Sequence, residues 1–381
     1  MNAIDQIRDR VRATYGGAIG RPRHYLVTPA LILDLDAVRR NIEAMAKMSR
    51  NWQARLRPHY KTHKSPELAR LQAKADAVGF CTATVWEAIA LVQSGLENVL
   101  VANEVVGFEK ISALAAEARN HRLMVAVDDP RNASDLDAAL RSARGSLEVL
   151  IDVDVGMGRC GVRSSKEAVA LAEHVTRLPH LRLRGVQGYE GHCMREPDRE
   201  ARAAKVKAAI DRLAGAAASL VRSGFACDIV SASGTGTCEW TGGDPRVTEI
   251  QAGSYLLMDR FHAGFGTEFV SAMTVLGTVV SRQGNTVVLD CGRKSVGIDF
   301  GPPALVDFPS CAPRYLAEEH VLFDLDGPCS LAVGDTAELV PGYAPSTVNL
   351  YDVFHVVENG TVVDVWPVVP RGPSHVGFLS E

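Results

Sequence analysis

Residues 147–176 read LEVLIDVDVGMGRCGVRSSKEAVALAEHVT, an apolar run followed by a loop and a helix-length stretch. The run at 147–153 predicts a buried strand, and the stretch at 165–176 predicts a helix. The same unit recurs along the chain, and such alternation implies a parallel sheet with right-handed crossover connections. The predicted strands lie at 56–60, 77–83, 98–102, 123–127, 147–153, 182–188, 227–232 and 248–254, and the predicted helices at 65–73, 84–94, 107–119, 131–142, 165–176 and 197–223.

Eight predicted strands, counted from Leu56, are the number that closes a (β/α)8 TIM-type barrel of roughly 200–250 residues. An open doubly wound sheet is the alternative, which we favour less because no GxGxxG motif opens an early helix. We expect the barrel to occupy residues 29–265. The strand at 31–36 could belong either to it or to the second domain.

The alternation of predicted strands and helices ends at about residue 270. After that point, turn signals such as QGN, DGP and ENGT separate short β runs. No helical pattern intervenes between these runs. We therefore expect an all-β C-terminal domain, built from residues 266–381 together with residues 1–28. Its predicted strands lie at 275–280, 286–290, 321–325, 336–340, 354–357 and 361–366.

The composition excludes several classes of protein. The 381 residues carry 41 Lys and Arg against 45 Asp and Glu, a net charge of −4, and 46% are hydrophobic. This excludes a disordered chain, and without a basic excess no nucleic-acid partner is expected. The sequence contains no apolar run of 18 residues, so no membrane span is predicted. The charged start of the chain does not resemble a signal peptide. Eight scattered cysteines without a CxxC pair indicate reduced thiols, so we expect a cytoplasmic enzyme with a small-molecule substrate.

The reactive side chains of a barrel enzyme lie where its strands end, because the active site is at the C-terminal face. The first strand ends in residues 57–64, RPHYKTHK, which places Lys61 at the barrel mouth. Desolvation there lowers the pKa of a lysine amine, as a nucleophile that forms a Schiff base requires. A solvated basic loop is the alternative interpretation of the same cluster.

Three later strand ends carry groups that suit a flat, phosphorylated ligand. The loop after the fifth strand surrounds Arg159 with glycines, which let backbone approach closely, although a tight turn would also explain them. The sixth strand ends in residues 187–192, QGYEGH. The seventh ends in residues 231–237, SASGTGT, whose hydroxyl and backbone N–H groups form a phosphate cradle. Together with the strand-end lysine, these groups suggest pyridoxal 5′-phosphate (PLP).

The chain resembles the fold-type III PLP enzymes of the D-threonine aldolase and D-serine dehydratase group, which are relatives of the alanine racemases. The resemblance extends from Thr28 to Arg371. It rests on the dispersed motifs TPALILDLDAVRRNI, LRPHYKTHK, ANEVVG, DVDVGMGRCGV, GVQGY, SGTGT, EIQAGSYLLMD, VVLDCGRKS and TVNLYD. It implies a barrel of alanine racemase type with a D-serine dehydratase-like β domain, assembled as a homodimer.

The resemblance also implies a role for each matching residue. Lys61 would be the Schiff-base lysine, with His59 of the same motif lining the site and Tyr189 near the cofactor. Arg159 would lie against the pyridine nitrogen and, because arginine only donates hydrogen bonds, would keep that nitrogen unprotonated. The residues implied to bind the phosphate are Ser233, Gly234, Thr235 and Gly236, with Tyr255 helping.

One segment departs from the family. A divalent metal beside the cofactor would be held there by a His and, two residues later, a Cys or Asp, just before a T-x-N-[LY] stretch. Tyr343 and Pro345 stand at these two positions. Proline has no ligating side chain and a lone tyrosine is a poor divalent site, so no metal is predicted. Tyr343 and His192 are the candidates to take over the role of the metal.

We expect a PLP-dependent carbon–carbon lyase that cleaves a β-hydroxy-D-amino acid to glycine and an aldehyde, as a D-threonine aldolase does, in a metal-independent form. Such a retro-aldol cleavage needs a base at the β-hydroxyl group. The candidate catalytic residues are Lys61, His59, Tyr189, His192 and Tyr343. A dehydratase (ammonia-lyase) or an amino-acid racemase on the same scaffold is the first alternative. A non-catalytic PLP carrier is the second, which the β domain argues against because such carriers consist of the barrel alone.

Overall fold

The computed structural model describes residues 3–327 and 329–372 of the chain. The chain divides into two compact units. The barrel unit comprises residues 46–61 and 69–253, and the β unit comprises residues 1–45, 62–68 and 254–381. Among the described residues, no helix combines the length and the apolar character that crossing a membrane requires.

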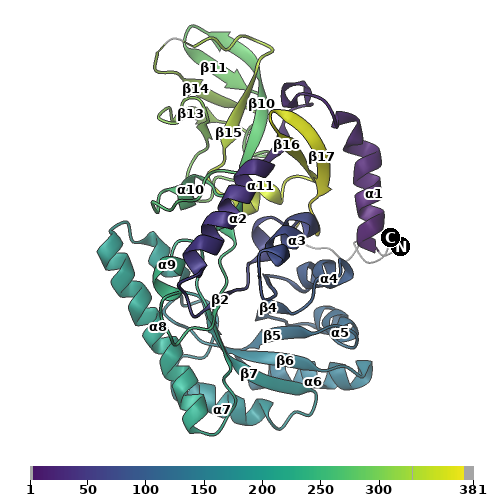
Figure 1. Cartoon of the computed structure of the whole chain (residues 1–381), viewed down its shortest axis with the longest axis vertical. Helices are drawn as coiled ribbons and strands as arrows, with labels where there is room; N and C mark the ends of the chain where they lie inside the picture. The colour runs from purple at the N-terminus through teal and green to yellow at the C-terminus, as the bar shows by residue number, and fades with distance from the viewer. Residues whose placement is uncertain (1–2, 328, 373–381) are drawn as a thin grey trace. The chain divides into compact units, whose positions relative to one another are not determined.

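The barrel unit contains eight parallel strands, and the (β/α)8 prediction is confirmed (Figure 1). The strands are β2 (Arg55–Leu56), β3 (Phe80–Thr82), β4 (Val99–Glu104), β5 (Leu123–Val127), β6 (Leu147–Asp152), β7 (Leu181–Gly188), β8 (Ile229–Ala232) and β9 (Glu249–Ile250). They pair in the order β2-β9-β8-β7-β6-β5-β4-β3. The ring closes where the chain beyond β2 meets β3, since the Cys81 amide donates to the Pro58 carbonyl at 2.9 Å.

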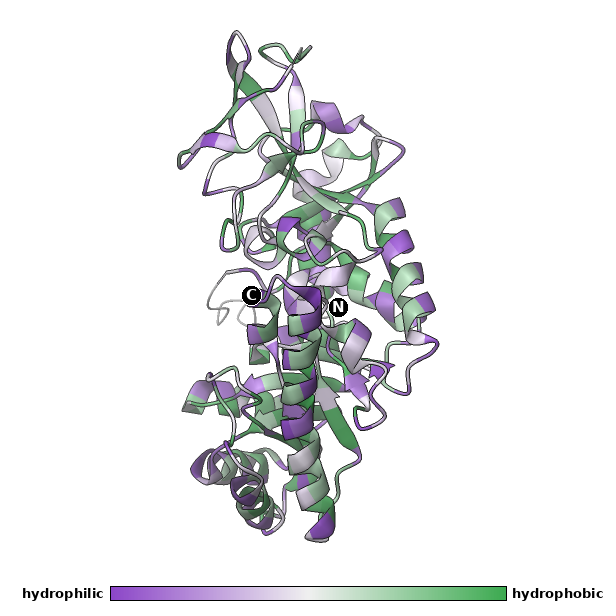
Figure 2. Cartoon of the chain, turned by 90° about the vertical axis from the view of Figure 1, so that its left-hand side faces the viewer, coloured by the Kyte–Doolittle hydropathy of each residue, from purple (hydrophilic) through white to green (hydrophobic). Residues whose placement is uncertain are grey.

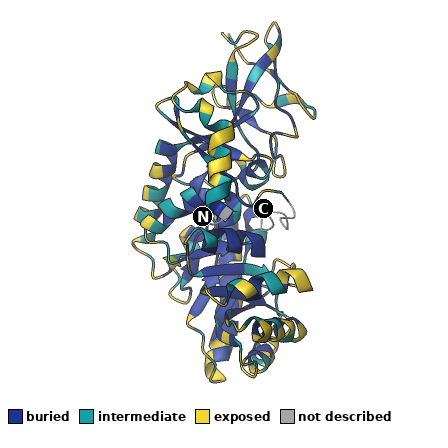
Figure 3. Ribbon diagram, turned by 90° about the vertical axis from the view of Figure 1, so that its right-hand side faces the viewer, coloured by how far each residue is buried: buried dark blue, intermediate teal, exposed yellow. Residues whose placement is uncertain are grey.

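Helices connect the strands of the barrel unit. They are α3 (Pro66–Lys74), α4 (Val85–Gln93), α5 (Phe108–Glu117), α6 (Pro130–Ala143), α7 (Ser165–Val175), α8 (Arg199–Arg222) and α9 (Cys238–Thr241). Thr84, Ser164 and Asp198 cap α4, α7 and α8 by accepting from amides of the first turn. Hydrophobic residues fill the strands and hydrophilic residues mark the outer face of α8 (Figure 2), and the strands are largely buried (Figure 3). The barrel core therefore lies along the strands and under the helices.

The β unit is built around a nine-stranded sheet. Its strands are β1 (Ala30–Asp34), β10 (Met273–Gln283), β11 (Thr286–Leu289), β12 (Ala304–Leu305), β13 (Pro313–Leu316), β14 (Val321–Asp324), β15 (Thr336–Val340), β16 (Val353–Glu358) and β17 (Thr361–Pro367). Strand β1 pairs antiparallel with β10 and parallel with β16. Segments from both ends of the chain therefore share one sheet.

The β unit is mostly β rather than all β. It also contains the helices α1 (Ala3–Tyr15), α10 (Arg260–Ala263) and α11 (Ala344–Val348), and α2 (Leu35–Ser49) begins in it. The sequence patterns do not predict α1, α10, α11, β12 or β13. Helices α10 and α11 have four and five residues, too few for an apolar repeat at helical spacing to show.

The ion pair between Arg57 and Glu249 joins β2 to β9 and generates a prediction about stability. Arg57 Nε and Nη2 each donate to a carboxylate oxygen of Glu249 at 2.7 Å, and Arg57 is only 1% exposed. Removing one partner leaves a buried, uncompensated charge, so we expect E249A to lower the free energy of unfolding by about 3–5 kcal/mol. Urea denaturation followed by circular dichroism measures this loss.

The matched control is E239A, because Glu239 pairs with Arg199 at the same distance of 2.7 Å but on the surface. We expect E239A to cost about 0–1 kcal/mol, as exposed ion pairs do. Equal losses in the two variants would contradict a special role of the buried pair in closing the barrel.

Candidate active site

Lys61 lies just beyond β2, in the short 3-10 helix η3 (Tyr60–Thr62). Its Nζ atom lies 5.7 Å from the centroid of the Tyr189 ring. Burial lowers the pKa of the Lys61 amine, and the positive charge of Arg159 lowers it further. An uncharged amine is nucleophilic, which is what attachment of an aldehyde cofactor requires.

The ring of Tyr189 lies close to a glycine of its own loop and to one of the loop after β8. A Cβ atom on Gly191 would overlap the ring, and one on Gly234 would lie 3.1 Å from ring carbon Cε2. Glycine at these positions leaves room for the ring. The hydroxyl group of Tyr189 donates to the sulfur of Met194 at 3.6 Å. The arrangement sets a flat aromatic surface near the Lys61 amine, which suits a planar ligand.

The predicted phosphate loop, residues 233–237, follows β8 and is buried throughout. The Gly234 amide donates to the Thr237 hydroxyl group at 3.2 Å. Within the described part of the chain, the amide of Gly236 has no acceptor. A buried N–H group without an acceptor costs free energy, and a ligand oxygen would remove that cost. The loop therefore fits a phosphate group.

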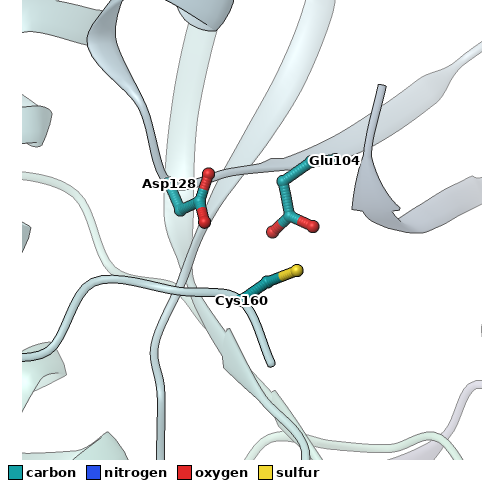
Figure 4. Close-up of side chains that lie close together, drawn as sticks. All are labelled: Glu104, Asp128 and Cys160. Atoms are coloured by element: carbon teal, nitrogen blue, oxygen red, sulfur yellow. The ribbon is translucent and has the colours of Figure 1, made fainter. Parts of the chain in front are cut away.

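Three side chains at successive strand ends point toward one another: Glu104 ends β4, Asp128 follows β5, and Cys160 lies in the loop after β6 (Figure 4). Their ligand atoms lie within 4.8 Å of one another. Burial, and then Glu104, raise the pKa of the Cys160 thiol to about 11. The thiolate that binds metals is therefore scarce at neutral pH. We refer to these three side chains as the acid cluster.

Asp152 at the end of β6 connects the acid cluster to a buried chain of amides. Burial and the nearby Glu104 raise the pKa of the Asp152 carboxyl group. Gln187 Nε2 donates to Asp152 Oδ1 at 3.1 Å, and Gln251 Nε2 donates to Gln187 Oε1 at 3.3 Å and to Ser231 Oγ at 2.9 Å. Neither these hydrogen-bonded amide side chains nor the acid cluster is among the predicted site residues. The sequence feature that could have indicated them is a polar side chain at or near the ends of successive predicted strands.

His59 and His192, two predicted catalytic residues, belong to the barrel unit. His59 follows β2, forms a bridge to Cys81 of β3 and is 9% exposed. His192 lies in the 3-10 helix η4 (Gly191–Arg195), where its Nε2 atom is 3.6 Å from Cys193 Sγ. Burial lowers the pKa of His192, so its imidazole is uncharged at neutral pH. The catalytic roles of both histidines stay predictions.

Two predicted tyrosines lie in the β unit. Tyr255 is buried in the 3-10 helix η5 (Ser254–Leu256), with its ring centroid 5.5 Å from that of Phe269. Tyr343 directly precedes α11, and its ring stacks on that of His262 at a centroid distance of 6.1 Å and an interplanar angle of 17°.

Tyr343 and Pro345 stand at the positions where no metal is predicted. The structure shows whether their side chains could bind a divalent ion. Burial, followed by the charges of Asp259 and Asp299, raises the pKa of Tyr343 to about 12. Its phenol therefore stays protonated near neutral pH. Pro345 lies in α11 and has no ligating side chain. This pair does not fit a divalent ion.

Comparison with known proteins extends over almost the whole chain. The family model of the alanine racemase N-terminal domain matches residues 33–260, and that of the serine dehydratase domain matches residues 272–357. The chain is 36% identical to the D-threonine aldolase of Arthrobacter sp. over 360 residues, which are 93% of this chain and 95% of the relative. It is 35% identical over 369 residues to the 3-hydroxy-D-aspartate aldolase of Paracoccus denitrificans, with the same two coverages. The crystal structure of D-threonine aldolase from Filomicrobium marinum matches with a TM-score of 0.89 at 37% identity, covering 93% of this chain and 98% of that one.

The chain therefore belongs to the alanine racemase N-terminal domain family, which is PLP-dependent. Within this family it is a carbon–carbon lyase of the D-threonine aldolase type, since these three relatives, at 35–37% identity over 93% of the chain, are aldolases. The family predicted from the dispersed motifs is confirmed.

The acid cluster generates a prediction about thiol reactivity. Because burial and Glu104 raise the pKa of the Cys160 thiol, E104Q is expected to lower that pKa and to speed alkylation of Cys160 by iodoacetamide at pH 8 about three- to tenfold. Mass spectrometry of the labelled peptides measures the rate. Cys227 is the internal control, since burial and Asp228 raise its pKa to about 11 without a contribution from Glu104. An unchanged rate at Cys160 would show that Glu104 does not control this thiol.

Proposed function

We propose that the protein is a PLP-dependent aldolase that cleaves a β-hydroxy-D-amino acid to glycine and an aldehyde, without a divalent metal at the position of Tyr343. The observation that carries the proposal is the Lys61 amine of lowered pKa beside the Tyr189 ring, in the same unit as the phosphate loop. The two aldolase relatives support the reaction class.

The barrel unit offers a partner for each part of PLP. Lys61 would attach the aldehyde carbon, Tyr189 would contact the ring, and the loop at 233–237 would hold the phosphate. When bound, PLP withdraws electrons from the substrate Cα atom and stabilises negative charge there. Arg159 stays positively charged at every relevant pH. Its contact with the pyridine nitrogen, like the help of Tyr255 at the phosphate, stays a prediction.

Cleavage of the bond between Cα and Cβ requires a base that takes the proton of the β-hydroxyl group. His192 suits this role because burial lowers its pKa and leaves the imidazole able to accept a proton. Tyr343, whose pKa is raised to about 12, could act only as a hydrogen-bond donor near neutral pH. We therefore propose a histidine, His192 or His59, as the base.

The comparisons bear differently on the alternatives. A non-catalytic carrier is disfavoured, because the aldolase relatives match 93% of the chain. A dehydratase or a racemase would use the same scaffold and is separated from the aldolase by its products. Assembly as a homodimer stays a prediction.

Because Tyr343 is a poor ligand and Pro345 has no ligating side chain, we predict that the reaction continues when divalent metal is removed. We expect enzyme dialysed against EDTA to release aldehyde from D-threonine within about twofold of the untreated rate, since no metal step is lost. Elemental analysis confirms that the metal is gone. A loss of more than about tenfold that Mn²⁺ reverses would contradict metal independence.

The role of Lys61 predicts both a spectrum and an activity. The PLP-loaded protein should absorb in the near-violet, and K61A should lose this band and more than about 10³-fold of the aldehyde release. K207A is the matched control, because Lys207 pairs with Asp211 on the exposed face of α8.

The substrate panel for this test comprises D-threonine, D-phenylserine and 3-hydroxy-D-aspartate, with the L isomers as controls. Failure to release an aldehyde from any β-hydroxy-D-amino acid would overturn the aldolase. A keto acid with ammonia would indicate a dehydratase, and exchange of the α-proton in deuterated water without bond cleavage would indicate a racemase.

A further inference from the structure

Glu190 lies directly beneath the phosphate loop and has no role in the chemistry described above. It follows Tyr189 just after β7 and is completely buried, with 0% exposure. Its Oε2 atom accepts from the Ser233 amide at 3.1 Å, and its Oε1 atom accepts from the Thr237 hydroxyl group at 2.7 Å. The hydroxyl group of Thr241 lies 3.4 Å from Oε1. One carboxyl group thus ties together both ends of the loop.

The loop conformation depends on these contacts. Ser233 has φ +81, a left-handed conformation that is strained for a residue other than glycine. The contact of its amide with Glu190 holds it there, and its hydroxyl group lies 3.0 Å from that of Thr237. With both ends held, the amide of the buried residue Gly236 has no acceptor among residues 3–327 and 329–372 and is available to a ligand.

Burial opposes a negative charge on Glu190 more strongly than the hydrogen bonds from Thr237 and Ser233 favour one. Among the described residues, no lysine, arginine or histidine forms an ion pair with it, and burial raises the pKa of its carboxyl group. The titratable groups that face it are Cys193 of η4 and Cys238 of α9, and burial raises the pKa of these thiols to about 11 and about 12. A buried carboxylate without a cation is costly, and a phosphate dianion in the adjacent loop would add repulsion.

We propose that Glu190 is the positioning residue of the phosphate loop, holding residues 233–237 in the conformation that receives the cofactor phosphate, and that it does so as a neutral carboxylic acid. This inference rests on the proposed function, since it requires PLP in that loop. The hydroxyl groups permit it, because Thr237 can accept from a protonated Glu190 and donate to the Gly234 carbonyl, 3.3 Å away.

Glutamine separates the charge of this side chain from its shape. In E190Q the amide oxygen can accept from the Ser233 amide, while the NH₂ group donates to the hydroxyl group of Thr237. E190D keeps an acid, but one methylene shorter, so it cannot reach both ends of the loop. E190A removes the contacts altogether.

The test compares PLP with pyridoxal, which has the same reactive aldehyde but no phosphate. Titrations of the full-length protein, followed at the near-violet band, give the Kd of each, and the Kd for pyridoxal divided by the Kd for PLP reports the phosphate contribution. We expect E190A and E190D to lower this ratio at least about tenfold while the Kd for pyridoxal stays within about twofold. E190Q should keep the ratio of the unmodified protein. E239Q, an exposed acid on α9, is the matched control and should also keep it.

Two results would overturn the inference. Equal weakening of PLP and pyridoxal in E190A and E190D would show a general structural role, and a ratio in E190Q as low as in E190A would show that the carboxylate charge is needed. If E190A does not fold, the Kd values of E190D alone are compared with those of the unmodified protein. Failure of the unmodified protein to bind PLP would instead overturn the proposed function.

Discussion

The buried ion pair between Arg57 and Glu249 joins the first strand of the barrel to the last, and the bridge from His59 to Cys81 completes the ring. Closure arranges the ends of eight strands around one axis, so side chains from distant parts of the sequence meet there. Lys61 follows the first strand, and Glu190 and the phosphate loop follow later ones. An open sheet would spread the same residues along an edge and leave them in water.

Burial at this ring of strand ends shifts four titratable groups toward their neutral forms. It lowers the pKa of Lys61 and of His192, and it raises the pKa of Asp152 and of Glu190. The common cause is the cost of holding a charge away from water. Arg159 adds a guanidinium, a side chain that only donates hydrogen bonds. The strand ends therefore combine groups whose pKa is shifted toward neutrality with one cationic side chain, an arrangement that suits an anionic cofactor and an amino acid.

Lys61 and the loop at 233–237 could be predicted because each belongs to a contiguous motif that follows an apolar strand. The acid cluster of Glu104, Asp128 and Cys160 could not, because its members come from three segments and none is unusual within its own segment. The sequence also showed that Pro345 has no ligating side chain and that Tyr343 is a poor divalent ligand. It did not show that the ring of Tyr343 stacks on His262 or that the pKa of Tyr343 rises to about 12, because both depend on packing between separate elements.

The sequence by itself determined the alternation of strands and helices, the closed barrel and the family, and it predicts Lys61 as the reactive lysine. These follow from hydrophobic periodicity and short motifs, which neighbouring residues encode. Only the tertiary structure decided which polar groups meet, which protonation states their burial favours, and that β1 joins β10 and β16 in one sheet. Desolvation and long-range pairing depend on residues far apart in the chain, so no local pattern could specify them.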